Sequence, residues 1–336
     1  MQKLKKLSLF VVCLMLIFSA SFMFVGCGEK DPNKIRLNEV THSIFYAPLY
    51  VALNLGFFED EGLDVTLESA SGSDSSMTTL ISGSADIILA GPEQVVYAEE
   101  VNDRPMVFGQ LTQKDGSFIV GKQNTSNFSI NDLKGKTIIG GRAGGMPAMT
   151  LQYVIEKAGL KIGTDAAKGE VNLRTDVAFA NIASEFITSN NEYCTLFEPT
   201  ATTLQNAGNG FVLKAVGDLS GYIPYTCFTA KSSFLKNHSE QAEKFLKAVY
   251  RGYQYIATET HEKSAAALKA SFTGMTTEEL KIAVSQYLAI DAWCESPVMS
   301  EQSFNNLLSV LNNSSGHTYN PNYADLVNTT IASKIA

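Results

Sequence analysis

The segment IRLNEVTHSIFYAPLYVALNLGFFEDEGLDVTL (residues 35–67) changes from strand-like to helix-like patterning and back. Ile35–Val40 is a short β-rich run that predicts a strand. Pro48 opens a helical run that Gly56 ends, because glycine tolerates the left-handed conformation that closes many helices. Leu63–Leu67 predicts a second strand. This order indicates the beginning of a parallel sheet covered by helices.

The same alternation continues to about residue 111. A helix capped at Ser73 is expected to end at Gly83, and Asp86–Leu89 has the apolar character of a buried strand. Pro92 begins the next helix, where a missing N–H costs nothing. Pro105–Leu111 predicts a further strand. The four strands and their intervening helices therefore predict a largely parallel sheet.

A second α/β unit follows. Phe118–Val120 predicts a strand, and after a polar stretch Lys136–Ile139 predicts another. Pro147 opens a helix that Gly159 ends, and Tyr193–Phe197 is again strand-like. From about residue 240 onward the chain is nearly all helical in pattern.

These patterns predict an α/β protein of two lobes joined by a two-strand hinge. The first lobe is expected at residues 35–120 and 229–336, and the second, inserted lobe at 121–228. The hinge is expected near Phe118–Gln123 and Thr226–Lys231. Ligands of open α/β sheets bind beyond the carboxyl ends of the strands, so the site is expected in the cleft between the lobes.

Residues 1–26 have the pattern of a secretory signal peptide. Three lysines lie among the first six residues, an apolar run covers Leu7–Val25, and a small residue follows. The run Phe24–Cys27 resembles the lipobox of bacterial lipoproteins, which implies lipidation of Cys27 and a flexible tether over residues 27–34. An uncleaved membrane helix is the alternative interpretation.

The composition limits the classes of function. The chain has 336 residues, of which 45% are hydrophobic and 18% are charged, so it is not a disordered or fibrous protein. Its formal net charge of −8 argues against a nucleic-acid-binding surface. With only 4 histidines and no CxxC pair, no metal site is expected. Cys194, Cys227 and Cys294 fit small buried residues, and a disulfide between two of them stays open.

Five motifs together carry a resemblance to a known family. They are HSIFYAPLYVA (residues 42–52), a GxF…GLxV pattern (residues 56–65), SGSADI (residues 82–87), LKGK (residues 133–136) and FEP (residues 197–199), where the family has Trp in place of Phe. The set resembles the solute-binding proteins of ABC importers for thiamine-pyrimidine precursors, alkanesulfonates, taurine and nitrate.

The resemblance implies a type II periplasmic-binding-protein-like fold that binds a small molecule and catalyses no reaction. It implies an ABC permease and its ATPase as partners, and no cofactor. It further implies a monomer held at the extracytoplasmic face of the cell membrane by the lipid on Cys27.

The candidate ligand-binding residues lie on turns that follow the predicted strands. Aromatic rings on the first turn can stack on a flat ligand, for about 0.5–1.5 kcal/mol each, and Glu198 can accept a hydrogen bond from an amino group on a heterocycle. Packing within a lobe is the alternative role for the rings, and an acid stabilised by a helix dipole is the alternative for Glu198. The full set is His42, Phe45, Tyr46, Ser71, Gly72, Pro92, Glu93, Arg142, Gly144, Gly145, Glu198 and Tyr222.

The glycine-rich turn at residues 140–147 predicts a different ligand chemistry. Exposed backbone N–H groups at a helix N-terminus can hold a carboxylate, sulfonate or phosphate, and Arg142 can clamp an anion. A tight turn without a ligand and a solvated arginine are the alternatives. The aromatic first turn, Glu198 and the acidic net charge favour a small heterocycle such as a thiamine pyrimidine precursor. An alkanesulfonate-, taurine- or nitrate-type anion is the alternative ligand.

Two other classes of function stay open. The sequence contains neither HExxH nor GxSxG. It also lacks the CCCFC motif of the yeast thiamine-pyrimidine synthases, which share this fold family. An exported enzyme related to those synthases is one alternative, and an extracellular sensor or adhesion lipoprotein without a permease is the other.

Overall fold

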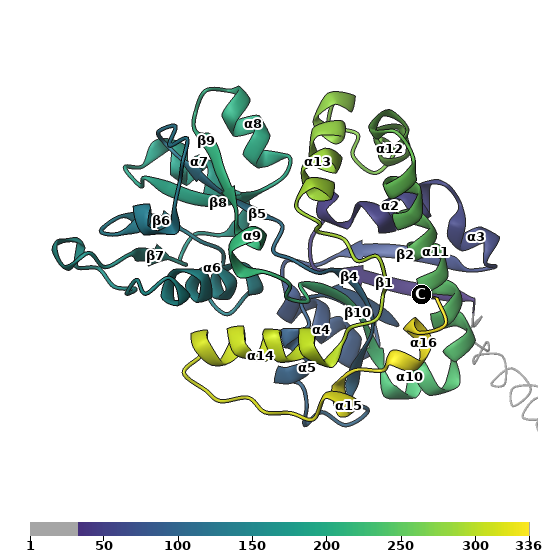
Figure 1. Ribbon diagram of the computed structural model, residues 1–336. Helices are drawn as coiled ribbons and strands as arrows, with labels where there is room; N and C mark the ends of the chain where they lie inside the picture. The colour runs from purple at the N-terminus through teal and green to yellow at the C-terminus, as the bar shows by residue number, and fades with distance from the viewer. Residues whose placement is uncertain (1–32, 336) are drawn as a thin grey trace, which may run out of the picture.

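The computed structural model describes residues 33–335, which form two α/β lobes (Figure 1). Each lobe contains a 5-stranded sheet. The expected fold class is therefore confirmed. The predicted signal peptide at residues 1–26, the lipidation site Cys27 and most of the predicted tether lie outside the described residues.

The first lobe is built on a sheet in the order β2-β1-β3-β10-β4. Strand β1 pairs in parallel with β2 and β3, whereas β10 runs antiparallel to β3 and β4. The strands are β1 (Lys34–Glu39), β2 (Asp64–Ser69), β3 (Ile87–Ala90), β4 (Pro105–Thr112) and β10 (Thr226–Lys231).

The second lobe is built on a sheet in the order β7-β6-β8-β5-β9. Strand β6 pairs in parallel with β7 and β8, and β5 runs antiparallel to β8 and β9. The strands are β5 (Ser117–Gly121), β6 (Thr137–Ile139), β7 (Asn172–Arg174), β8 (Tyr193–Phe197) and β9 (Phe211–Ala215).

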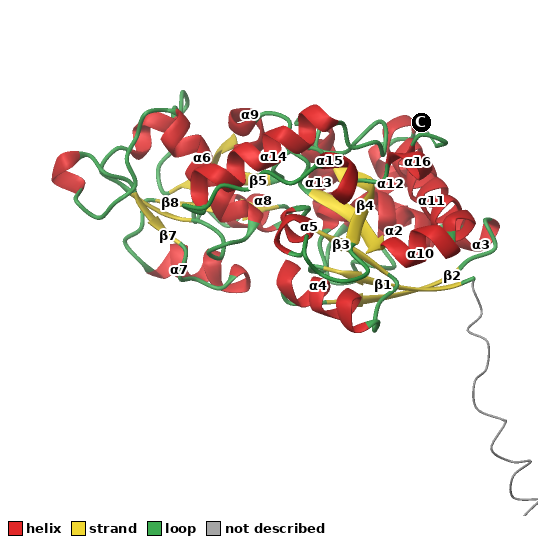
Figure 2. Cartoon of the chain, turned by 90° about the horizontal axis from the view of Figure 1, so that it is seen from below, coloured by secondary structure: helices red, strands yellow, loops and turns green. Residues whose placement is uncertain are grey.

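Helices cover the sheets of both lobes (Figures 1 and 2). Those that precede β5 or follow β10 are η1 (Ile44–Tyr46), α2 (Ala47–Asn54), α3 (Phe57–Asp60), α4 (Ser73–Ser82), α5 (Glu93–Tyr97), α10 (Ser232–Asn237), α11 (Ser239–Thr258), α12 (His261–Leu268), α13 (Thr277–Ala289), α14 (Glu301–Ser314), α15 (Tyr323–Leu326) and α16 (Thr329–Ala332). Those between β5 and β10 are η2 (Ile130–Leu133), α6 (Met146–Lys157), η3 (Ala166–Lys168), η4 (Phe179–Asn181), α7 (Ile182–Thr188), α8 (Thr200–Asn206) and α9 (Val216–Ser220). Among residues 33–335, no helix combines the length and the apolar content that a membrane crossing requires.

Local signals in the sequence explain where several helices begin and end. Gly56 follows α2 with a φ of 73°, a conformation that favours glycine. Pro147 lies in the first turn of α6, where it removes no intrahelical hydrogen bond. Thr276 and Glu279 form a capping box at the start of α13, in which each side chain accepts from the backbone N–H of the other residue.

The chain crosses between the lobes at residues 113–116 and 221–225, because α9 still packs on α6, β5 and β9 of the second lobe. Strand β5 pairs only with strands of the second lobe, and β10 only with strands of the first. The expected boundaries, 120/121 and 228/229, therefore fall inside strands β5 and β10. In the structure, all of β5 belongs to the second lobe and all of β10 belongs to the first. The reason is that strand pairing is a long-range property, which a short β-rich run does not reveal.

Helix α14 returns from the first lobe and packs against α6 of the second (Figures 1 and 2). The Asn313 side chain of α14 donates a hydrogen bond to Glu156 Oε2 of α6. The main hydrophobic cluster likewise continues from Phe45 in the first lobe to Phe118 and Leu196 in the second. The two lobes thus share apolar core at their junction.

Candidate functional site

Four buried carboxylates gather where strands of both lobes end, and we call them the carboxylate cluster. Glu39 ends β1, Glu93 begins α5 directly after β3, Asp115 lies in the crossing from β4 to β5, and Glu198 follows β8. Their exposed fractions are 0%, 0%, 0% and 2%. No lysine or arginine is buried in the described part of the chain. This is the position at which an α/β sheet offers a ligand site.

Glu39 is the best satisfied member of the cluster. Ser69 Oγ donates to its Oε1 at 2.6 Å, the Tyr50 hydroxyl donates to its Oε2, and His42 Nδ1 lies 3.3 Å from Oε1. Burial nevertheless raises its pKa, because desolvation outweighs these hydrogen bonds. Glu39 is therefore a structural anchor for the first turn.

His42 is held within the first lobe. Its Nε2 lies 3.0 Å from the Ser271 carbonyl oxygen, and its ring stacks on Phe272 with centroids 4.6 Å apart. Both ring nitrogens thus face acceptors, the second being Glu39. A ligand that bound His42 would therefore have to replace one of these contacts, and its role in binding stays a proposal.

Glu93 is buried without a full set of hydrogen-bond donors. Gln94 Nε2 donates to its Oε1 at 3.2 Å, but its Oε2 has no hydrogen-bond partner among residues 33–335. A β-carbon placed on Gly91 would lie 2.0 Å from that oxygen, so the carboxylate folds back over the end of β3. Burial raises the pKa of Glu93 to about 7.

Asp115 is the second under-satisfied carboxylate. Its Oδ1 accepts hydrogen bonds from the N–H and hydroxyl of Ser117 at 2.7 and 2.6 Å. Within the described chain no donor meets hydrogen-bond geometry at its Oδ2, although the Tyr225 hydroxyl lies close to the carboxyl. Burial raises the pKa of Asp115 to about 6, and burial, followed by the charge of Asp115, raises the pKa of the Tyr225 phenol.

Glu198 ties the second lobe to α13. Its carboxylate accepts from the Thr202 hydroxyl at 2.9 Å and from the Thr202 N–H at 3.1 Å. Its own backbone N–H donates to the Tyr287 hydroxyl at 3.0 Å. Burial raises the pKa of Glu198, although the bonds from Thr202 oppose the shift.

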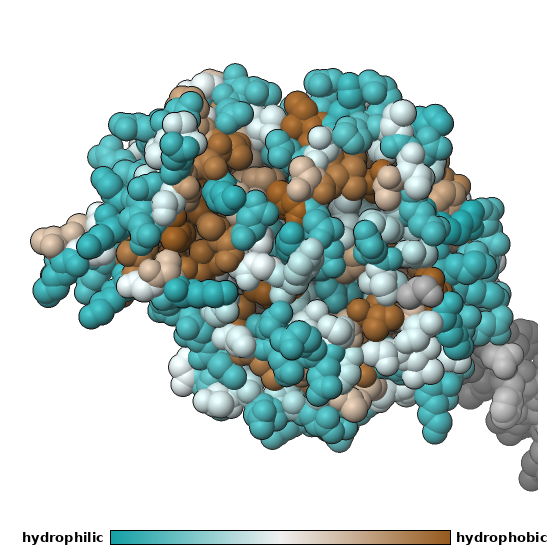
Figure 3. Space-filling view, in the orientation of Figure 1, coloured by the Kyte–Doolittle hydropathy of each residue, from teal (hydrophilic) through white to brown (hydrophobic). Residues whose placement is uncertain are grey.

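Aromatic rings fill the space between the carboxylates. The Phe45 ring lies 5.5 Å from Phe197, 5.8 Å from Tyr225 and 5.0 Å from Tyr287, measured between centroids. Tyr46 is buried as well, and this burial, followed by the charges of Glu39 and Glu93, raises the pKa of its phenol. Phe197 comes from the second lobe, so this aromatic cluster (Phe45, Tyr46, Phe197, Tyr225 and Tyr287) spans the junction. On one face of the molecule, apolar residues also gather at the notch between the lobes (Figure 3).

The glycine-rich turn is separate from the carboxylate cluster. Its Arg142 lies on the exposed surface where the two lobes meet, which we call the rim. Arg142 is paired with Asp74 of the first lobe, with 3.3 Å between Nη2 and Oδ2, and both side chains are more than half exposed. The Arg142 guanidinium lies over Gly72, where a β-carbon would come within 3.3 Å of it. Gly144 and Gly145 precede α6 without contacting the carboxylate cluster. The Arg142–Asp74 pair therefore bridges the lobes at the surface.

Apart from His42, the structure separates the predicted site residues into two groups. Phe45, Tyr46, Glu93 and Glu198 meet at the junction, with Pro92 buried beside Glu93. Ser71 is exposed, and Tyr222 is 53% exposed, with its hydroxyl donating to Asp291 Oδ2 at 2.6 Å. The rim group is Ser71, Gly72, Arg142, Gly144, Gly145 and Tyr222.

Sequence reasoning missed Glu39, Asp115 and Tyr287. The position of Glu39 at the carboxyl end of the predicted first strand was a usable signal, because ligand sites of α/β sheets lie there. Asp115 stands in a stretch, KDGS, that has the composition of an ordinary turn. Tyr287 belongs to a helix far along the chain, and only the fold brings it to Glu198.

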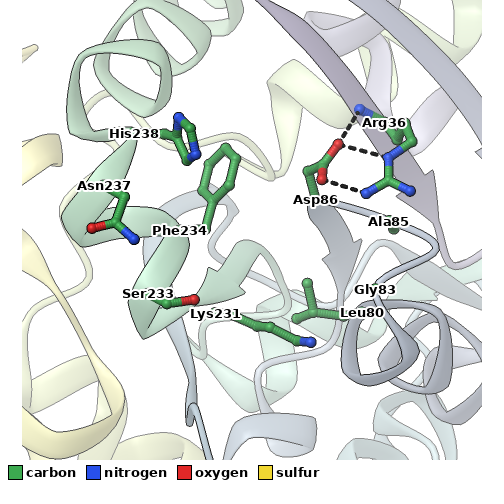
Figure 4. A pocket seen from close by; sticks show the side chains of 10 residues that line it. All are labelled: Arg36, Leu80, Gly83, Ala85, Asp86, Lys231, Ser233, Phe234, Asn237 and His238. Carbon is green, nitrogen blue, oxygen red and sulfur yellow. Dashed lines mark hydrogen bonds and ion pairs between the residues drawn. The ribbon is translucent and has the colours of Figure 1, made fainter. Parts of the chain in front are cut away.

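A separate hollow of about 230 Å³ lies in the first lobe between β1, α4 and α10 (Figure 4). Its basic side chains are engaged: Arg36 forms a bidentate pair with Asp86, at 2.5 and 2.9 Å, and Lys231 Nζ donates to the Ile81 carbonyl oxygen at 2.8 Å. The carboxylate cluster does not line this hollow. We therefore take the lobe junction as the candidate functional site.

Comparisons with known proteins agree with the architecture. A protein of Bacillus subtilis (strain 168) named "Putative binding protein YtlA" is 36% identical over 317 residues, which cover 94% of this chain and 93% of that protein. A ligand-binding component of an ABC-type import system from Staphylococcus aureus superposes with a TM-score of 0.72 at 12% identity, covering 90% of this chain and 99% of that one. The alkanesulfonate-binding protein SsuA of Xanthomonas axonopodis pv. citri superposes with a TM-score of 0.67 at 15% identity, covering 89% and 99%.

The structural neighbours show the fold alone, since their identities are low. The family model described as NMT1/THI5 like matches residues 44–263, which include β3, β8 and most of the junction. The resemblance found in the motifs is therefore confirmed, and the chain belongs to the NMT1/THI5-like family.

Proposed function

We propose that this protein is the lipid-anchored, extracytoplasmic substrate-binding component of an ABC importer. Its family and the fold that it shares with the Staphylococcus aureus import component and with SsuA support this role. The described chain begins at the end of the first lobe remote from the second (Figure 2). A tether attached through Cys27 would thus leave the junction free to face the permease, whose ATPase drives transport.

The ligand that the junction fits best is a small, flat heterocycle carrying an amino group, such as a thiamine pyrimidine precursor. The observation that carries this assignment is the carboxylate cluster interleaved with aromatic rings. Ionised carboxylates are acceptors only, so they select ligands that donate hydrogen bonds. The rings of the aromatic cluster offer faces on which a planar ligand stacks.

A sulfonate- or nitrate-type anion fits the junction less well. The name of SsuA describes it as an alkanesulfonate-binding protein, and this chain shares its fold at 15% identity. Here, however, an anion at the junction would face four acids, and Arg142 is already paired with Asp74 at the rim. Like charges at short range in a buried site are strongly unfavourable.

The mechanism is binding coupled to closure of the lobes. The aromatic cluster draws rings from both lobes, so a ligand placed among them contacts both only when the lobes are together. Such a ligand shifts the equilibrium toward the closed form by its difference in affinity for the two forms. The permease would then recognise the closed shape and receive the ligand unchanged.

Isothermal titration calorimetry of the purified full chain in mild detergent tests this function. The panel contains amino-pyrimidines, taurine, an alkanesulfonate and nitrate. We expect saturable binding of an amino-pyrimidine, and a weakened affinity in Glu93→Gln and Asp115→Asn. Binding of only the anions would overturn the assignment of the ligand, and turnover of any ligand would overturn the transport role.

A further inference from the structure

The carboxylate cluster contains two oxygen atoms that are buried without any hydrogen-bond partner. Within residues 33–335, no donor meets hydrogen-bond geometry at Glu93 Oε2 or Asp115 Oδ2, and the buried Tyr225 hydroxyl is the group that faces the Asp115 carboxyl. Tyr225 lies within electrostatic reach of both acids. Buried polar groups are nearly always paired in native proteins, so two neighbouring carboxylate oxygens without a well-placed donor point to a ligand.

Among residues 33–335, no basic side chain forms an ion pair with Glu93 or Asp115. His42, the nearest basic side chain of the first turn, is committed to Glu39 and the Ser271 carbonyl. Lys114 lies over the Tyr222 ring at 4.6 Å and within 4.0 Å of Asp291, and Arg142 pairs with Asp74. A buried, ionised carboxylate without a cation destabilises the folded state strongly. A role for Glu93 and Asp115 in stability alone therefore does not explain why they are buried here.

The surrounding aromatic rings, like the buried carboxylates, favour a positively charged ligand. Phe45, Tyr225 and Tyr287 present aromatic faces whose quadrupole attracts cations and repels anions. The Phe45 ring lies directly under Gly116, next to Asp115: a β-carbon there would be 2.3 Å from it. Aromatic rings and under-satisfied carboxylates thus lie together at the base of the junction.

We propose that the ligand of the junction is an organic cation: a flat heteroaromatic ring with a protonated amine or protonated ring nitrogen, whose positive end lies between Glu93 and Asp115. This inference rests on the proposed function, because it specifies the charge of that ligand. A neutral ligand would leave two desolvated carboxylates without a counter-charge, whereas a cation compensates both and donates to their free oxygens.

Two probes of nearly the same shape test the charge. Near pH 7.5, 4-aminopyridine is protonated and 4-aminopyrimidine is neutral, while benzenesulfonate supplies a flat anion. We expect the full chain, titrated calorimetrically, to bind 4-aminopyridine at least about tenfold more tightly than 4-aminopyrimidine, as for hydrogen bonds to charged groups. Equal or tighter binding of 4-aminopyrimidine would overturn the cation proposal and leave the amino-heterocycle function intact. Binding of benzenesulfonate alone, or of none of the three at millimolar concentration, would overturn both.

A matched pair of variants connects the charge preference to the cluster. Glu93→Gln keeps the shape of the side chain and removes its charge, so we expect the preference for 4-aminopyridine over 4-aminopyrimidine to fall at least about tenfold. Glu59→Gln, an exposed change on α3, serves as the control and should leave the preference unchanged. A melting temperature for each variant checks that it is folded. An unaltered preference in folded Glu93→Gln would contradict the proposed position of the positive end.

Discussion

The backbone N–H of Glu198 donates a hydrogen bond to the hydroxyl of Tyr287 across the junction, with 3.0 Å between the two atoms. Glu198 follows β8 of the second lobe, and Tyr287 lies on α13 of the first. Both residues are buried, and the Tyr287 ring lies beside Phe45. This bond therefore reports directly on whether the lobes are together.

Tyr287→Phe removes the acceptor of that bond and keeps the ring. We expect the free energy of unfolding to fall by about 1–3 kcal/mol, because a buried N–H is left unpaired. We also expect weaker ligand binding, since the closed form is the one that loses the contact. Urea denaturation and calorimetry measure the two effects. Tyr255→Phe on α11 is the control, and an equal loss in both variants would mean that the lobe-to-lobe bond has no special role.

Arg142→Ala breaks the exposed ion pair with Asp74 at the rim. Pairs of this kind contribute about 0–1 kcal/mol, so we expect little change in stability and at most a severalfold change in affinity for an amino-heterocycle. The affinity is measured by titration at low and at physiological salt. A complete loss of binding would indicate that Arg142 holds the ligand, as the anion hypothesis requires.

Stability should depend on pH through Glu93 and Asp115. Their pKa values are raised in the folded protein, to about 7 and about 6, from 4.5 and 3.8. The folded state therefore binds protons more tightly, so these groups favour folding below about pH 4 and lose that contribution as pH rises to 7. For Glu93 alone the loss is on the order of 3 kcal/mol.

Thermal unfolding of the ligand-free protein between pH 4 and 8 measures this dependence. Glu93→Gln should flatten the profile and raise stability near pH 7.5, because the buried charge is gone. A Glu93→Gln profile parallel to that of the unmodified protein would show that Glu93 ionises normally.

Cys27→Ser tests the anchor predicted from the lipobox-like run. We expect the unmodified protein in the membrane fraction after expression in a bacterial host, labelled by a fatty-acid analogue. The variant should lose the label, because serine offers no thiol for the lipid. Labelling of the variant at an unchanged level would show that the lipid is attached elsewhere.

The strand and helix order was predictable because its signals are local. Gly56, Pro92 and Pro147 each act on the backbone within one helical turn, and each marks a helix end in the structure. The sheet to which β5 or β10 belongs depends on partners 50 or more residues away. The boundaries between the lobes were therefore displaced by a few residues.

The site was predictable only in part for a related reason. Phe45, Tyr46 and Glu93 follow strands of the first sheet, so the rule of carboxyl strand ends locates them. Asp115, Tyr225 and Tyr287 come from a crossing segment and a distant helix. The order of residues in the sequence does not show that these residues meet. It does not show the pairing of Arg142 with Asp74 either.

The central claim is that a ligand lies between the lobes and is held by buried acids. A crystal structure of the protein with its tightest-binding amino-heterocycle tests it most directly. The account predicts a ring against Phe45 and Tyr225, its amino group within hydrogen-bond distance of Glu93 or Asp115, and contacts from both lobes. A ligand found at the turn of residues 142–145, or on one lobe only, would contradict it.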